Sequence, residues 1–302
     1  MFQDFHATLA SPILAILPLL AFAIFGCSGD HPGSRIGRTV PGDVFTDPGV
    51  RSLADAAGTG DVKEIDRLVA AGVDVNATGK QGMTPLVWAM AARNREGFLR
   101  LLERGADPNR QHPDIDLGGG SSVTSMAASS KIDSFFLKAA LEHGANPNLV
   151  EPTGNRAQPE ERTTPLHRAI SSRRVENLDL LIRAGADLNH KGGHFGATPL
   201  VDAAAVNWYE GVYRLLEAGA DYRIKTDAGT DLADLAVDEP IPYALETRRW
   251  KDKVLDFLEK KGADLAAARK KAEARGFRTK KWTEEEWKEK TPNKGWPIPK
   301  DE

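Results

Sequence analysis

The sequence predicts an all-α fold in which about six short helix-turn-helix units stack side by side. Two recurring features and their spacing carry this prediction. Thr-Pro-Leu occurs three times, and each copy is followed at a similar distance by Gly-Ala-Asp, with a pair of leucines just before the glycine. The Thr-Pro-Leu copies begin at Thr84, Thr164 and Thr198, and the Gly-Ala-Asp copies begin at Gly105, Gly185 and Gly219.

Each part of the unit has a physical role. The Thr hydroxyl can cap free backbone N–H groups, and Pro suits the first turn of a helix. The leucine pairs, such as Leu101-Leu102, place apolar side chains on the second helix, and the glycine can take the left-handed conformation that ends it. One unit cannot bury its apolar stripe alone, so neighbouring units must supply the core.

The fullest copy is Thr164-Pro165-Leu166-His167-Arg168-Ala169. This motif, closed by Gly-Ala-Asp at a period of about 33 residues, resembles the ankyrin repeat. The resemblance implies an ankyrin-repeat solenoid with β-hairpin loops between its helix pairs.

Degenerate copies complete the count at six units across 47–265. The first holds Leu53 and Gly72-Val73-Asp74, the third starts at Ser122-Val123 in place of Thr-Pro, and the last starts at Asp231-Leu232. Insertions before Ser122, before Thr164 and inside the last unit contain glycines and prolines, which indicates loops.

The N-terminal segment has an apolar run over residues 7–25, followed by Cys27, the only cysteine of the chain. This arrangement resembles the lipobox of bacterial lipoproteins, which implies a signal peptide over 1–27, an acylated Cys27 and a flexible tether over 28–46. Asp4 and the absence of Lys or Arg from residues 1–6 depart from a usual signal peptide. The alternative is an uncleaved membrane anchor.

The C-terminal extension, 266–302, combines a basic stretch with Trp282, Trp287 and Trp296. One interpretation is a solvated cap helix with a frayed end. The other is a segment that lies on an anionic membrane surface or clasps a partner.

No catalytic constellation, metal site or cofactor site is evident, and the net charge of −3 does not indicate a nucleic-acid partner. His167 occupies a structural position of the repeat motif, while His190 and His194 lack further ligands at metal-binding spacing. The recurring aspartates are typical of turns. They are Asp107, Asp187, Asp221 and Asp264. We therefore expect a non-enzymatic protein without a small-molecule substrate.

The resemblance places partner contacts on the concave surface, at the hairpin tips and at the ends of the first helices. The matching positions are Lys80, Gln81, Met83, Ala91 and Ala92 in one repeat, and His194, Phe195, Ala197, Val206 and Asn207 in another. Trp208 and Tyr209 follow directly. Met83, Phe195, Trp208 and Tyr209 are the expected anchors, because exposed aromatic and Met side chains supply large contact areas. The alternative for Trp208 and Tyr209 is that they cover the turn between their own helices.

Bacterial ankyrin lipoproteins of this outline include immunity proteins that block secreted phospholipases or other toxins. The resemblance thus implies a protein tethered to the bacterial envelope, facing the periplasm and binding a cognate toxin. One alternative is a scaffold or protective partner of an envelope enzyme. Another is a secreted effector acting in a host cell, which a retained lipid disfavours.

Overall fold

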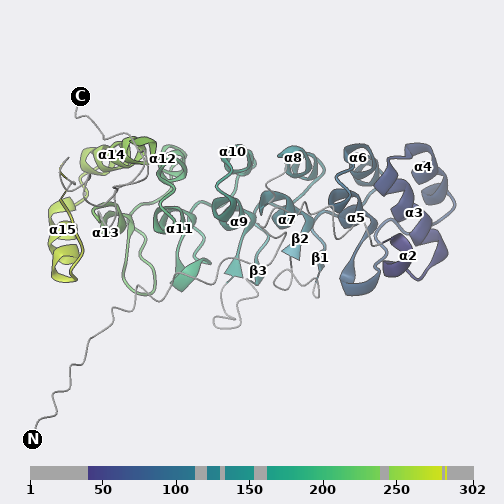
Figure 1. Cartoon of the computed structure of the whole chain (residues 1–302), viewed down its shortest axis with the longest axis horizontal. Helices are drawn as coiled ribbons and strands as arrows, with labels where there is room; N and C mark the ends of the chain where they lie inside the picture. Colours follow the sequence, from purple (N-terminus) through teal and green to yellow (C-terminus); the bar gives the residue numbers. More distant parts are fainter. Residues whose placement is uncertain are drawn as a thin grey trace, which may run out of the picture.

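Two rows of helices run along the long axis of the molecule (Figure 1). The computed structural model describes residues 40–112, 121–129, 133–152, 162–238, 245–280 and 283. The inner row consists of α3 (Pro48–Thr59), α5 (Pro85–Ala91), α7 (Val123–Ser129), α9 (Pro165–Ser172), α11 (Pro199–Ala205) and α13 (Leu232–Ala236). The outer row consists of α4 (Val62–Ala70), α6 (Arg95–Glu103), α8 (Phe135–Glu142), α10 (Val175–Arg183), α12 (Tyr209–Glu217) and α14 (Leu245–Lys260).

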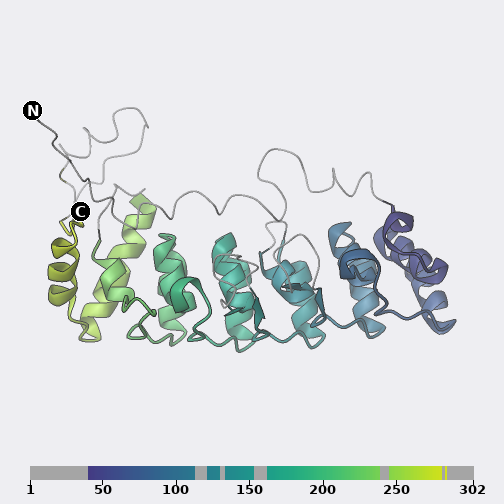
Figure 2. The same ribbon diagram turned by 90° about the horizontal axis from the view of Figure 1, so that it is seen from below.

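Each inner helix and the outer helix that follows it form one repeat, and the described part of the chain holds six such pairs. Figure 2 shows the pairs succeeding one another in chain order along the long axis. The predicted all-α solenoid of six units is therefore confirmed.

The helices begin as the Thr-Pro motif predicts. Thr84 Oγ1 accepts from the backbone N–H of Val87 at 3.2 Å. Thr198 Oγ1 accepts from Val201 in the same way at 3.4 Å, and each Pro occupies the first helical turn. At the other end of the repeat, Gly105 and Gly185 have φ of 89° and 80°. This left-handed conformation ends the outer helix and turns the chain toward the next repeat.

A continuous hydrophobic cluster extends from Leu53 in the first repeat to Ala272 beyond the last. The leucines of the outer helices contribute Leu101, Leu181 and Leu215, all completely buried. Because each repeat packs mainly on its neighbours, the core forms a stripe between the two helix rows.

Two antiparallel β-hairpins project below the inner helices (Figure 1). In one, β1 (Gln111–His112) pairs with β2 (Ser121–Ser122), and in the other, β3 (Glu151–Pro152) pairs with β4 (Arg162–Thr163). The corresponding turns of the second and fifth repeats are 3-10 turns, η2 (Lys80–Gly82) and η3 (His194–Gly196). The hairpins flank the first two predicted insertions, whose interiors, 113–120 and 153–161, lie outside the described residues.

The N-terminal end departs from the expected tether. The helix α2 (Pro41–Val44) packs on α3, and the buried Phe45 ring contacts Trp88. Residues 41–46 therefore belong to the folded domain, because an aromatic side chain buried in the core fixes them there. The remainder of the tether, 28–39, and Cys27 lie outside the described residues.

The start of the C-terminal extension forms α15 (Leu265–Ala274), which packs on α13. Leu265, Ala268 and Ala272 are buried, and Lys271 pairs with Asp234. This segment corresponds to the cap-helix interpretation. The three tryptophans of the extension lie outside the described residues, and no helix among those described is long and apolar enough to cross a membrane.

Candidate partner-binding surface

The hairpin turns and the inner helices lie on one side of the solenoid, which we call the inner face (Figure 1). In the second repeat, Lys80 and Gln81 are exposed in η2. Met83 is half-buried against the core, and Ala91 and Ala92 are half-buried at the end of α5. This repeat therefore offers mainly polar side chains at its turn.

The fifth repeat presents the larger apolar side chains. Phe195 is 50% exposed in η3 and Val206 is 37% exposed after the last turn of α11. His194 and Asn207 are also exposed, whereas Ala197 is buried at 2%. Ala197 stabilises the turn through its backbone, because its carbonyl oxygen accepts hydrogen bonds from the N–H groups of Gly192 and Gly193.

The turn that carries Phe195 is held by several contacts. Phe195 has φ of 54°, a left-handed conformation that costs a non-glycine residue about 1 kcal/mol. Its carbonyl oxygen accepts from the backbone N–H of Asp227 at 2.9 Å. The Asp227 carboxylate in turn pairs with Lys191 Nζ at 2.8 Å. The sixth repeat therefore fixes the tip of the fifth, and the aromatic ring is presented on a preorganised turn.

Trp208 and Tyr209 are not exposed anchors. They are 8% and 2% exposed, and a Cβ on Gly211 would lie 2.4 Å from the Trp208 ring. The Tyr209 hydroxyl donates to the carbonyl of Leu235 at 3.4 Å. The expectation of exposure was wrong for this pair, because the turn between α11 and α12 needs large side chains to cover its apolar interior. Trp208 packs over Gly211 of its own repeat, as the alternative interpretation expects, whereas Tyr209 contacts Leu235 and Lys251 of the sixth repeat.

Cationic groups lie beside the apolar positions of the inner face. Arg173 has φ of 52° after α9, and its guanidinium donates to the carbonyl of Val206. Lys191 and His194 are exposed at the turn of the fifth repeat. Between the turn and Val206 lies Asp202, whose carboxylate packs against Gly193. The fourth and fifth repeats thus combine two exposed apolar side chains with the positive charges of Arg173 and Lys191, the latter paired with Asp227.

An asparagine ladder, which the sequence reasoning missed, fixes the spacing of the repeats. Asn76 Nδ2 donates to the carbonyl of Gly105 at 3.0 Å, and Asn76 Oδ1 accepts from the N–H of Asp107 at 2.8 Å. The same position recurs at Asn109, Asn148 and Asn189, each with a contact to the next repeat. In the first four repeats an asparagine stands two residues after the repeat aspartate or the asparagine that replaces it, and this was the available signal.

The repeat aspartates are structural, as expected. Asp107, Asp187 and Asp221 each accept from a backbone N–H two residues further on. Asp264 differs because it caps the start of α15. These carboxylates therefore serve turns and helix ends.

The histidines also act in the framework. His167 is buried at the start of α9, with Nδ1 at 3.0 Å from Thr164 Oγ1. Burial lowers the pKa of His167 to about 3, so its imidazole is neutral at physiological pH. His190 Nε2 lies 3.0 Å from the carbonyl oxygen of Arg162. The described ranges contain no group of three or more residues arranged to hold a metal ion.

Comparisons with known proteins agree with this architecture. The family model "Ankyrin repeats (3 copies)" matches residues 124–226, and the model "Ankyrin repeat" matches residues 81–113. The solved ankyrin-repeat domain of Bcl-3 superposes with a TM-score of 0.54 at 23% identity, covering 70% of this chain and 86% of that one. This similarity concerns the fold.

Several curated relatives share the sequence pattern. Protein PhlB of Serratia liquefaciens is 31% identical over 194 residues, which are 64% of this chain and 78% of that protein. The cyclin-dependent kinase 4 inhibitor B of Bos taurus is 32% identical over 143 residues, 47% of this chain and 97% of that protein. The human mitochondrial disaggregase is 28% identical over 206 residues, 66% of this chain. The chain spans only 26% of that disaggregase.

Ankyrin repeats bind other proteins through their surface, and the fold is generally non-catalytic. The six helix pairs, the glycine-ended outer helices and the matched repeats have one common explanation. This chain belongs to the ankyrin-repeat family.

Proposed function

We propose that this protein is a lipid-anchored immunity protein of the bacterial envelope, which binds and neutralises a secreted toxin of the phospholipase type in the periplasm. The observation that carries the binding role is Phe195, a half-exposed aromatic side chain on a turn fixed by the next repeat. An aromatic side chain that is already ordered loses little entropy on binding, so it suits an interface anchor.

The surroundings of Phe195 support a partner surface of a particular chemistry. Val206 adds a second exposed apolar side chain on the same repeat, and Arg173 and Lys191 add positive charges, of which Lys191 is paired with Asp227. Charged groups at the rim of an interface favour a partner of opposite charge and speed association. The toxin surface that docks here is therefore apolar at its centre and acidic around it.

Two relatives support the proposal in different ways. PhlB is a bacterial protein of which this chain covers most of the length. The cyclin-dependent kinase 4 inhibitor is named for the inhibition of an enzyme. An immunity protein acts in the same general manner, because it occupies the surface of an enzyme and blocks its activity.

Calorimetry with the product of a neighbouring phospholipase gene tests the binding role. We expect tight binding by the native protein and a Kd at least about tenfold higher for Phe195→Ala, because a central aromatic contributes about 1.4 kcal/mol or more. Val40→Ala is the matched control, since Val40 is exposed at the opposite end of the solenoid. Equal affinity of Phe195→Ala and the native protein would remove Phe195 from the interface.

A growth assay tests immunity itself. Cells that lack this protein should lose viability beside toxin-secreting siblings, and the native gene should restore it while Phe195→Ala restores it only partly. Full survival of the deletion strain would end the immunity proposal and leave the scaffold interpretation.

The anchor is tested at Cys27. Metabolic labelling with an acyl precursor should mark the native protein and leave Cys27→Ala unlabelled, because that thiol is the only one in the chain. Label that persists in Cys27→Ala, or a native protein without label, would contradict lipid anchoring.

A further inference from the structure

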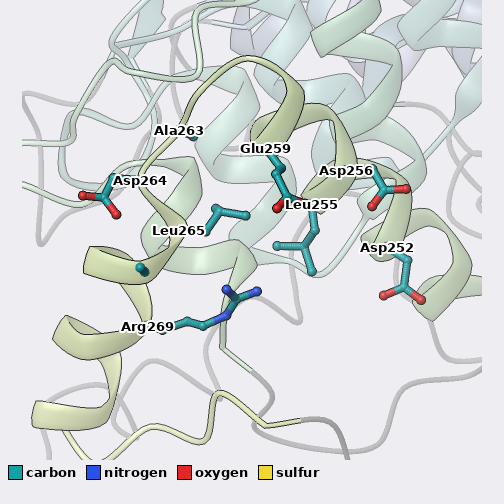
Figure 3. A pocket seen from close by; sticks show the side chains of 9 residues that line it. Asp252, Leu255, Asp256, Glu259, Ala263, Asp264, Leu265 and Arg269 are labelled. Carbon is teal, nitrogen blue, oxygen red and sulfur yellow. The ribbon is translucent and has the colours of Figure 1, made fainter.

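A groove lies between α14 and α15, at the C-terminal end of the solenoid (Figure 3). Its volume is about 570 Å³, and Leu255, Ala263 and Leu265 supply its apolar part. Figure 3 shows Asp252, Asp256 and Glu259 on α14, with Arg269 reaching in from α15. The groove is therefore lined by both apolar side chains and charged groups.

The charge of this groove is strongly negative. Asp252, Asp256 and Glu259 recur at helical spacing on one side of α14, and Asp264 lies at the start of α15. Arg269 is the single cationic residue that lines the groove. Asp256 and Glu259 are exposed and form no ion pair with any described residue. Like charges three and four residues apart destabilise a helix, so this stripe favours an occupant that brings positive charge.

A second hollow of about 440 Å³ continues the groove along α14 and shares Asp252 and Asp256 with it. It contains Trp250, whose ring centroid lies 5.6 Å from that of Tyr213. Lys253 Nζ lies 4.1 Å from the centre of the Trp250 ring. Its charged lining comprises Glu246, Asp252 and Asp256 against Arg249 and Lys253, so this hollow is less acidic than the first, and Lys253 already lies over the face of Trp250.

We propose that residues 287–300 of this chain occupy the groove. This segment holds four lysines and one glutamate, a net charge of +3, together with Trp287, Trp296 and Ile298. Its lysines pair with Asp256 and Glu259, and a tryptophan packs on Leu255 and Leu265. The preceding acidic run, Glu284-Glu285-Glu286, stays outside the groove because like charges repel it.

The chain length permits this placement. The Thr279 hydroxyl bonds to Glu273 near the end of α15, and the groove begins at Leu265 on the same helix. Eight helical residues correspond to about 12 Å, whereas the six residues 281–286 span up to about 20 Å when extended. A covalently tethered segment also has an effective concentration in the millimolar range, so modest affinity suffices.

Docking of this segment covers the acidic end of the solenoid and leaves the inner face free. The groove is thus a second interaction surface, separate from the one that holds Phe195. A basic, tryptophan-containing segment of a partner would have to displace residues 287–300 before it could bind there.

Zero-length carbodiimide crosslinking of the full chain tests this placement, because the reagent joins a lysine amine to a carboxylate only when they touch. We expect intramolecular links from Lys288, Lys290 or Lys294 to Asp256 or Glu259. Glu273 is the internal control, since it is exposed and nearer along the chain. Links to Asp256 and Glu259 should exceed those to Glu273 and fall at least about threefold in 1 M salt, where screening acts within about 3 Å.

Trypsin cleavage of the full chain gives a second measurement. The double variant Asp256→Lys and Glu259→Lys should be cut at Lys288 and Lys290 at least about tenfold faster than the native chain, because charge reversal expels the segment. Asp55→Lys with Glu142→Lys is the matched control, since both carboxylates are exposed on other repeats.

Equal cleavage of the two double variants, or crosslinks spread evenly over exposed carboxylates, would overturn the proposal. Crosslinks that join two chains would assign the groove to another copy instead and overturn it as well.

Discussion

The Glu151 carboxylate joins two neighbouring repeats through Ser122. Glu151 Oε1 accepts a hydrogen bond from the backbone N–H of Ser122 at 2.8 Å, and Glu151 is completely buried. Ser122 stands where other repeats have the Thr of Thr-Pro-Leu, and its hydroxyl caps Ser125 at 3.2 Å. The weakened motif of the third repeat is thus supported by a side chain from the fourth.

We expect Glu151→Ala to lower the free energy of unfolding by about 2 kcal/mol, because the buried N–H of Ser122 loses a charged acceptor. Arg168 would lose a neighbouring negative charge at the same time. Burial lowers the pKa of the Arg168 guanidinium, and the Glu151 charge partly offsets that effect. Urea unfolding followed by circular dichroism measures the change.

Two variants give the comparison. Glu151→Gln keeps an oxygen acceptor and should retain part of the stability, whereas Glu176→Ala, at an exposed position of α10, should leave the midpoint unchanged. A Glu151→Ala midpoint equal to the native one would show that the link between the repeats contributes nothing.

The pH dependence of stability should report on His167. Its pKa is about 3 in the folded protein because of burial, against an ordinary value of about 6.5 in the unfolded chain. Between these values the unfolded state binds the extra proton, so stability rises with pH. The contribution of His167 is complete above about pH 6.5 and is lost as the pH falls toward 3.

Between pH 7 and pH 5 the native protein should therefore lose about 2 kcal/mol more than His167→Gln, which has no proton to gain. Denaturant unfolding at the two pH values measures this difference. His194→Gln is the control, because it removes an exposed imidazole from another repeat. Parallel curves for His167→Gln and the native protein would contradict a neutral buried imidazole.

Local motifs predicted most of the fold, since each repeat is specified within its own residues. Thr84, Pro85 and Gly105 act on the backbone beside them, so their roles can be read from the sequence alone. The contribution of Phe45 could not be read in this way. It depends on Trp88 in another repeat, and only the stacked structure brings the two rings together.

The exposure of the expected contact residues was predicted in part, for a similar reason. Phe195 and Trp208 are both large aromatic residues at positions expected to face a partner. Their exposures differ because Phe195 sits on a turn held above the core, whereas Trp208 packs over Gly211. Asn207, directly before Trp208, has a left-handed φ of 57°. The direction of the Trp208 side chain depends on this backbone turn, and the spacing of residues in the sequence does not reveal that direction.

The close approach of α6 to α3 requires a glycine at position 97. A Cβ added there would lie 2.0 Å from the carbonyl oxygen of Ala57. We expect Gly97→Ala to cost about 3 kcal/mol, because backbone atoms cannot move aside as a side chain does. Thermal unfolding measures the loss.

Gly105→Ala separates this steric effect from backbone strain. Gly105 has φ of 89°, and nothing lies within 4 Å of an added Cβ, so the cost there should be only about 1 kcal/mol. If Gly97→Ala proves as mild as Gly105→Ala, the two helices are further apart than the packing described.

The Phe45 side chain should be the main stabiliser of the first repeat. It is buried against Trp88, with ring centroids 6.2 Å apart in an edge-to-face arrangement. We expect Phe45→Ala to lower the free energy of unfolding by about 3 kcal/mol through the cavity that it leaves.

In a solenoid each repeat depends on its neighbours, so the loss of stability should be local. Amide hydrogen exchange should therefore speed up in α3 and α4 and stay unchanged in α9–α12. Val40→Ala, at an exposed side chain a few residues earlier, should leave all these rates as they are. Faster exchange along the whole chain would instead mean that the repeats unfold as one cooperative unit, and unchanged exchange in α3 would mean that α2 and Phe45 are not docked in solution.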